Sequence, residues 1–287
     1  MLKTAAKYKY TLLLISVAAF WSTSYGLSKI CQEYVNAYTL LTLRFLSAFL
    51  IMFPILYKSI TPIKKKEIAC AAKLGTLMFA ACLSMVLGVK STTATNAGFI
   101  VGMSVVFVPV IMRIFYKVPV SVHTLIALVM SASGICFLTL GGEMGFHSGD
   151  LLCLVCAVCY ASYIVFTGNS LRGQNPVAVG VMQFLFMGMY SAAADLAAGG
   201  FHIPAAPVFW GALAVMVILG TAYCFIVQVI AQQHVSATAA GITLSLEPVF
   251  SAFFAYFTLG ERLGISQFVG AGLMLGGVIW VSTREQR

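Results

Sequence analysis

Apolar residues along the chain fall into long continuous runs, separated by short polar segments. Each run is about 20 residues long, the length that an α-helix needs to cross the hydrocarbon core of a bilayer. The runs lack the strict alternation of apolar and polar positions that marks a half-buried strand. The pattern therefore predicts transmembrane helices. The predicted helices span residues 10–28, 36–57, 67–89, 93–115, 120–140, 149–168, 177–197, 207–230, 235–258 and 263–282.

The composition supports a membrane location. Of the 287 residues, 61% are hydrophobic and 9% are charged, and the mean hydropathy is +0.98. A soluble domain carries about 25% charged residues, so this chain cannot cover itself with a polar surface. In a bilayer the backbone must satisfy its own hydrogen bonds, which helices do within each segment. We predict an all-α integral protein of the cell membrane, with ten transmembrane helices.

The basic residues indicate how the helices are oriented. The net charge of +9 would suggest nucleic-acid binding in a soluble protein, but membrane proteins concentrate Lys and Arg in cytoplasmic segments. With the N-terminus inside, thirteen basic residues fall in or beside the inner segments and three in the outer ones, while Arg44 remains within a span. We therefore expect both termini in the cytoplasm and no nucleic-acid partner. The three outer residues are Lys29, Lys90 and Arg262.

The eight cysteines do not indicate a metal site or a cofactor. Most of them lie inside apolar runs. Cys153, Cys156 and Cys159 form a C-x2-C-x2-C string, but on a helix these side chains would point in different directions. We interpret them as small packing residues, and we expect neither a metal nor a cofactor.

The two halves of the chain are related in sequence. Residues 94–98, Ala-Thr-Asn-Ala-Gly, match residues 237–241, Ala-Thr-Ala-Ala-Gly, at an offset of 143. Earlier in the halves the offset is 139, where residues 44–46, Arg-Phe-Leu, match residues 183–185, Gln-Phe-Leu. One short insertion reconciles the two offsets. Other matches at 139 are Asn36 with Asn175 and Trp21 with Tyr160.

The repeat predicts two halves of five helices, residues 1–144 and 145–287. Because five is odd, the second half must enter the membrane upside down relative to the first. Inverted repeats are common in secondary transporters, whose substrate site lies near the midplane between the halves.

Several short sequence motifs lie along the predicted helices. They are Leu43-Arg44-Phe45, residues 94–98, Ser236 to Ala240, Leu246-Glu247-Pro248-Val249-Phe250, Leu259-Gly260-Glu261-Arg262-Leu263, and the glycines 270, 272, 276 and 277. Over essentially the whole chain, these motifs resemble the EamA-type transporters of the drug/metabolite transporter superfamily. The resemblance implies ten helices in two inverted repeats and the transport of a small metabolite. The first half departs from the pattern, since residues 116–119, Tyr-Lys-Val-Pro, stand in place of a Gly-Glu-Arg element.

Glu247 is the sharpest candidate for function. It lies near the middle of the ninth predicted helix, where a carboxylate is costly unless it is paired or hydrated. It could couple transport to protons, or accept a hydrogen bond from a substrate amine. The structural alternative is that Pro248, which follows it, frees a backbone carbonyl, and that a protonated Glu247 bonds to the backbone or to Thr243 near that break.

Arg44 is the other charge within a span. It could attract a substrate carboxylate, or it could snorkel to the interface and pin its helix. Its repeat partner is the uncharged Gln183, so any electrostatic role belongs to one half only.

Uncharged polar and aromatic residues complete the candidate site. Within or near the spans, Asn96, Tyr223 and Gln228 could bond either to a substrate or to neighbouring helices. The aromatic candidates are Trp21, Tyr160 and Tyr163, with Tyr25 closer to a helix end; they could form the wall of a site for an amphiphilic substrate or an interfacial belt. Thr243 lies on the polar stripe of Glu247, and Pro109 and Pro248 are candidate hinges.

The sequence thus predicts a secondary transporter rather than an enzyme, exporting amino acids or similar amphiphilic compounds by alternating access. No phosphate-binding loop is found, so energy would come from protons or from the substrate gradient. The G-x-x-x-G patterns at Gly98 and Gly272 permit close helix contacts, within a subunit or in a homodimer. The alternatives are an intramembrane lipid-modifying enzyme and a membrane receptor or sensor.

Overall fold

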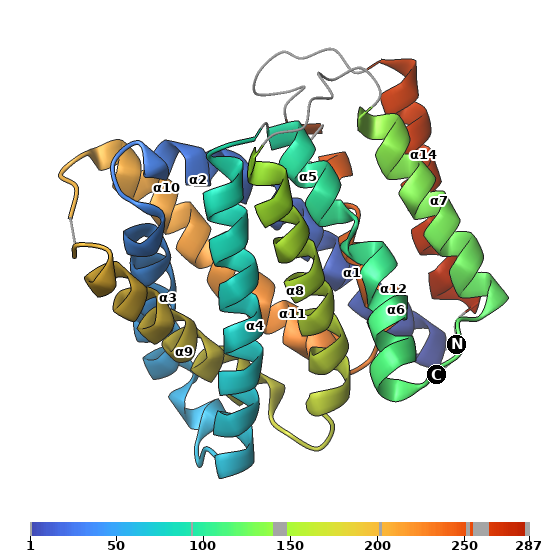
Figure 1. Ribbon diagram of the computed structural model, residues 1–287. Helices are drawn as coiled ribbons and strands as arrows, with labels where there is room; N and C mark the ends of the chain where they lie inside the picture. Colours follow the sequence, from blue (N-terminus) through green and yellow to red (C-terminus); the bar gives the residue numbers. More distant parts are fainter. Residues whose placement is uncertain are drawn as a thin grey trace.

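The computed structural model describes residues 2–92, 94–139, 148–200, 203–250, 253–254 and 264–284 (Figure 1). Within these ranges the chain forms helices and connecting turns, and no strand. The helices are α1 (Leu2–Ser22), α2 (Ser24–Gln32), α3 (Ala37–Ile60), α4 (Lys65–Val89), α5 (Ala94–Gly102), α6 (Ser104–Tyr116), α7 (Val122–Thr139), α8 (Ser148–Ser170), α9 (Pro176–Ala197), α10 (Pro207–Val217), the π-helix η1 (Ile218–Tyr223), α11 (Cys224–Ala231), α12 (Ala237–Leu244) and α14 (Ile265–Arg284).

Six helical segments are long and apolar enough to cross a membrane, and four shorter apolar helices accompany them. Together they occupy the ten segments that the hydropathy pattern predicts, so the helical membrane fold is confirmed. The long segments are Tyr8–Gln32, Ala37–Ile60, Lys65–Val89, Ser148–Ser170, Pro176–Ala197 and Pro207–Ala231. The shorter ones are Ile100–Tyr116, Val122–Phe137, Ala237–Phe250 and Phe268–Val281.

The bundle has two distinct sides. α1 begins and α14 ends on the same side, and the turns from α3 to α4 and from α8 to α9 also lie there (Figure 1). We call this the termini side and the opposite one the far side. α8 therefore runs from the far side to the termini side, and α9 runs back.

The two halves pack with twofold symmetry. α3 lies along α9 and α7 along α14, so helices that the repeat matches are direct neighbours. Between α7 and α14, a Cβ atom on Gly134 would lie 2.7 Å from the carbonyl oxygen of Gly270, and one on Gly277 would lie 3.1 Å from that of Ala127. At the offset of 143, Gly134 matches Gly277 and Ala127 matches Gly270. The two close contacts are therefore images of each other.

Buried carboxylates brace α9 at both ends, against α3 on the far side and against α4 on the termini side. On the far side, Asp195 accepts hydrogen bonds from Thr39 Oγ1 at 2.8 Å and from Asn36 Nδ2 at 3.2 Å. On the termini side, Glu67 accepts one from the backbone nitrogen of Asn175 at 3.1 Å. Asn36 and Asn175 also cap the first turns of α3 and α9. These bonds fix the scaffold that surrounds the cavity described next.

Candidate functional site

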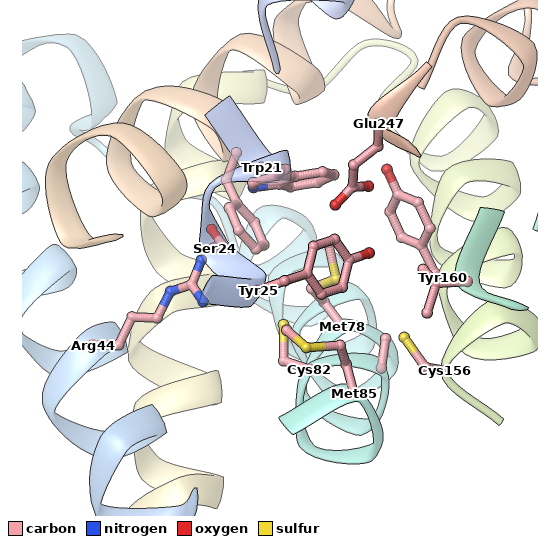
Figure 2. Close-up of a pocket in the computed structure, with 13 residues that line it drawn as sticks. Trp21, Ser24, Tyr25, Arg44, Met78, Cys82, Met85, Cys156, Tyr160 and Glu247 are labelled. Carbon is pink, nitrogen blue, oxygen red and sulfur yellow. The ribbon is translucent and has the colours of Figure 1, made fainter. Parts of the chain in front are cut away.

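A cavity lies between the two halves of the bundle (Figure 2). The space that a water-sized solute can occupy is about 60 Å³, enough for several water molecules. Its walls come from α1, α2, α3, α4, α5, α8 and α11 and from the short helical stretch that follows the turn after α12. The lining residues are Trp21, Ser24, Tyr25, Arg44, Met78, Ala81, Cys82, Met85, Val101, Cys156, Tyr160, Phe225 and Glu247.

Three helix interruptions place backbone next to this cavity. One lies at Thr23, between α1 and α2, and a second lies at Met103, between α5 and α6. The third follows α12, where a turn at Ser245 and Leu246 precedes Glu247. At the offset of 143, Leu246 matches Met103, so the last two interruptions are repeat images. Transporters commonly bind substrate where spanning helices are discontinuous.

Glu247 stands at the start of the short helical stretch that follows the third interruption. Its carboxyl group points towards the rings of Trp21, Tyr25 and Tyr160 (Figure 2) and interacts with the Tyr25 hydroxyl. Thr243 donates its hydroxyl to the carbonyl oxygen of Ala239 at 2.8 Å. Thr243 thus donates to its own helix, while the carboxyl group of Glu247 is directed to the cavity.

Arg44 is buried, with 2% of its surface exposed. Its Nε donates to Thr221 Oγ1 at 2.6 Å, and its Nη2 donates to the carbonyl oxygen of Gly220 at 3.0 Å. Trp21 Nε1 donates to that same carbonyl at 2.8 Å. The alternative in which Arg44 snorkels to the interface is wrong, because these bonds hold the guanidinium inside the bundle, at the edge of the cavity.

The carbonyl oxygen that accepts from both Arg44 and Trp21 belongs to a π-helix. Gly220 and Thr221 lie within η1, and π-helical turns occur frequently at functional sites. A Cβ atom on Gly220 would lie 2.9 Å from Ser24 Oγ and 3.4 Å from Arg44 Nη2. The absence of a side chain at Gly220 therefore leaves room for Ser24 and Arg44.

Arg44 and Glu247 lie on different walls of the cavity, with Trp21 and Tyr25 between them in Figure 2. Trp21 meets Tyr160 edge to face, with ring centroids 5.6 Å apart, and meets Phe225 in the same way at 5.4 Å. The cavity thus offers a cation, an anion and an aromatic wall. This combination suits a zwitterionic molecule with an apolar or aromatic part.

Sulfur atoms form another part of the wall. Met78, Cys82 and Met85 follow one another at helical spacing on α4, and Cys156 faces the same cavity from α8. Of the C-x2-C-x2-C string, only Cys156 belongs to the lining, as expected if the three point in different directions. These soft side chains adapt readily to apolar groups.

Four of the predicted candidates line the cavity: Glu247, Arg44, Trp21 and Tyr160. Five others lie elsewhere. Tyr163 donates to Gln183 at 3.3 Å, Tyr223 shares a hydrogen bond of 2.8 Å with Ser16, Thr243 bonds to its own helix, and Gln228 is fully buried. The side chain of Asn96 is outside the described part of the chain.

The two candidate hinges differ in their surroundings. Pro248 follows the interruption after α12, and its Cγ would lie 3.3 Å from a Cβ atom on Gly102. Pro109 is instead buried inside α6, and the interruption of that span occurs earlier, at Met103. The two interruptions, at Gly102–Met103 and Ser245–Pro248, therefore contact each other near the centre of the bundle.

Tyr25, which the sequence places among the aromatic residues but near a helix end, is directed to the cavity beside the interruption at Thr23. The other lining residues were not predicted from the sequence. Apolar lining residues such as Met85 and Phe225 cannot be distinguished by hydropathy from apolar residues packed in the core. The others are Ser24, Met78, Ala81, Cys82, Val101 and Cys156.

Comparisons with known proteins agree with the fold and its repeat. The model of the EamA-like transporter family matches residues 9–140 and again residues 147–283. An uncharacterized transporter of Archaeoglobus fulgidus is 29% identical over 272 residues, which cover 94% of this chain and 85% of that protein. The uncharacterized transporter YcbK of Bacillus subtilis is 28% identical over 57% of this chain and 54% of its own length.

A solved crystal structure has the same fold. It superposes with a TM-score of 0.78 over 96% of both chains, at 17% sequence identity. The family model, matched twice along nearly the whole chain, is the stronger finding. The chain is a multi-pass protein of the cell membrane and belongs to the EamA-like transporter family.

Proposed function

We propose that the protein is a secondary transporter that exports a small zwitterionic metabolite, of the amino-acid type, by alternating access. One observation carries this proposal: Arg44 and Glu247 line a single cavity between the two halves, beside interrupted helices. Arg44 would hold the carboxylate of the solute. The aromatic and sulfur walls would receive its apolar part.

Glu247 is proposed to couple transport to protons. Its carboxyl group is directed to the cavity, and it would lie near the middle of the predicted span 235–258, where an ionisable group is costly and is commonly functional. The Tyr25 hydroxyl that interacts with it would hold the carboxylate in place when the proton leaves. The chain itself would carry out no covalent chemistry.

The orientation belongs to the same proposal. The termini side, which carries Lys64, Lys65 and Arg172 in its turns, would face the cytoplasm under the positive-inside rule. The halves 1–144 and 145–287 would rock against each other about the contact between Gly102 and Pro248. Export would then run from the termini side to the far side.

A flux assay tests the proposal. The purified protein is reconstituted in liposomes and offered radiolabelled amino acids, nucleosides and quaternary amines. We expect exchange of at least one amino acid, lost in protein inactivated by heating. Formation of a modified product without flux would contradict transport and support a lipid-modifying enzyme, and binding without either would support a receptor.

A further inference from the structure

Four polar side chains are fully buried on the termini side of the cavity. We call them the buried amide cluster: Tyr163 on α8, Gln183 on α9, Gln228 on α11, and Gln232 directly after α11. α8 and α11 both end on that side, and α9 begins there. None of the four lines the cavity.

The hydrogen bonds of this cluster are incomplete. Tyr163 donates to Gln183 Oε1 at 3.3 Å, and Gln232 Nε2 donates to the carbonyl oxygen of Ile164 at 3.3 Å. Among the described residues, Gln183 Nε2, Gln232 Oε1 and both polar atoms of Gln228 have no partner. A buried polar group without a partner is destabilising, so these atoms are suited to bind water or the polar groups of a solute.

Two aromatic rings of the cavity wall border the cluster. The ring centroids of Phe225 and of Tyr160 each lie 6.5 Å from that of Tyr163. Of the two, Phe225 is on the same helix as Gln228. Phe225 and Gln228 lie three residues apart on α11, and Gln232 directly follows that helix. Phe225 reaches α8 at Tyr163, and Gln232 reaches it at Ile164. Gln228 lies between them along the chain, on a helix that packs against α1 and α9.

The repeat relates this cluster to the cavity. At the offset of 139, Ser24 matches Tyr163 and Arg44 matches Gln183. The first member of each pair lines the cavity, and the second belongs to the buried amide cluster. Because the halves are inverted, the images of residues that line one route should line the route to the other side.

We propose that the buried amide cluster lines the termini-side half of the solute route, and that Phe225 is the barrier between this half and the cavity. This rests on the proposed transport function. The cluster would bind hydrogen-bonding groups of the solute, either donors or acceptors, through its amides. It contains no charged side chain, so the ionic contact with Arg44 is made only in the cavity.

Cysteine labelling tests this route. The eight native cysteines are replaced, solute exchange is verified, and Gln228→Cys is introduced. A membrane-impermeant maleimide is then added to one side of the liposomes at a time. We expect labelling from the termini side, and at least about tenfold slower labelling from the far side, because a minor conformer is commonly populated at 10% or less.

A second substitution tests the barrier. With Phe225→Ala added, the far-side reagent should no longer need to wait for a rare conformer in which Phe225 has moved aside. Far-side labelling should therefore rise to within about threefold of the termini-side rate. Phe209→Ala is the matched control, because Phe209 is an equally buried ring of the same span, packed against Tyr34 and Trp210. It should leave the difference between the sides intact.

Gln232→Cys serves as the second position if Gln228→Cys does not fold. The route is wrong if neither cysteine reacts from the termini side in protein that exchanges solute, or if labelling is equal from both sides with Phe225 intact. Labelling requires no solute. One-sided labelling in a protein that moves none of the tested solutes would therefore contradict the proposed function and support the barrier.

Discussion

The guanidinium of Arg44 donates a hydrogen bond of 3.0 Å to the carbonyl oxygen of Gly220, within a π-helix of the opposite half. This bond joins α3 to the span that contains η1, and it directs a buried cation to the cavity. The second half has Gln183 at the position that matches Arg44. The charge at this site therefore comes from one repeat and its acceptor from the other.

Replacing Arg44 should weaken solute binding. Arg44→Gln removes the charge but keeps a hydrogen-bond donor, and Gln is the residue at the matching position of the other repeat. A hydrogen bond to a charged group contributes about 1.5–3 kcal/mol, so KM for a carboxylate-bearing solute should rise roughly tenfold or more. Initial rates of exchange in liposomes measure this change. Unchanged KM values for Arg44→Gln and Arg44→Lys would show that the carboxylate binds elsewhere.

A side chain at Gly220 should disturb the position of Arg44. In Gly220→Ala the Cβ atom would lie 2.9 Å from Ser24 Oγ and 3.4 Å from Arg44 Nη2, so the Ser24 hydroxyl must rotate or α2 must shift beside the guanidinium. We expect exchange to fall severalfold while the protein still folds, as measured by flux and by size-exclusion chromatography. Gly211→Ala, in the same span with nothing within 4 Å, should behave like the wild type. Equal activity of the two variants would exclude a positioning role for Gly220.

Glu247 should be required for proton coupling. Glu247→Gln keeps the shape of the side chain but cannot release a proton, so proton-driven uptake should be abolished while counterflow exchange continues. Uptake is measured with and without an imposed pH gradient. Loss of counterflow as well would instead assign the carboxylate to solute binding. Proton-driven uptake that persists unchanged would rule out the coupling role.

Asp195 should stabilise the fold rather than act in transport. Asp195→Ala leaves Asn36 Nδ2 and Thr39 Oγ1 without their acceptor, which should cost about 1–3 kcal/mol and lower Tm in detergent. Glu33→Gln, at an exposed acid beside α2, should leave Tm unchanged. The account of the brace fails if Asp195→Ala has the wild-type Tm, or if the folded variant loses exchange completely.

The sequence was sufficient to predict the helices because their ends are chemically marked. Asn36 and Asn175, for example, directly precede apolar runs, and each caps the first turn of the helix that follows it. It also predicted Glu247 and Arg44, since charge is rare within a span. The π-helix at Ile218–Tyr223 was not predicted, because no Pro or unusual spacing announces it. Likewise, the interruption at Thr23 follows no Pro or Gly, so the orientation of Tyr25 could not be inferred.

The most direct test of the cavity as the solute site uses Trp21. The chain has three tryptophans, so Trp210→Phe and Trp280→Phe leave Trp21, which lines the cavity, as the only indole. We predict that a solute which the protein exchanges will change the Trp21 emission saturably, and that Arg44→Gln will raise the half-saturating concentration. Saturable exchange with no change in Trp21 emission, together with a wild-type response of Arg44→Gln, would contradict the central claim.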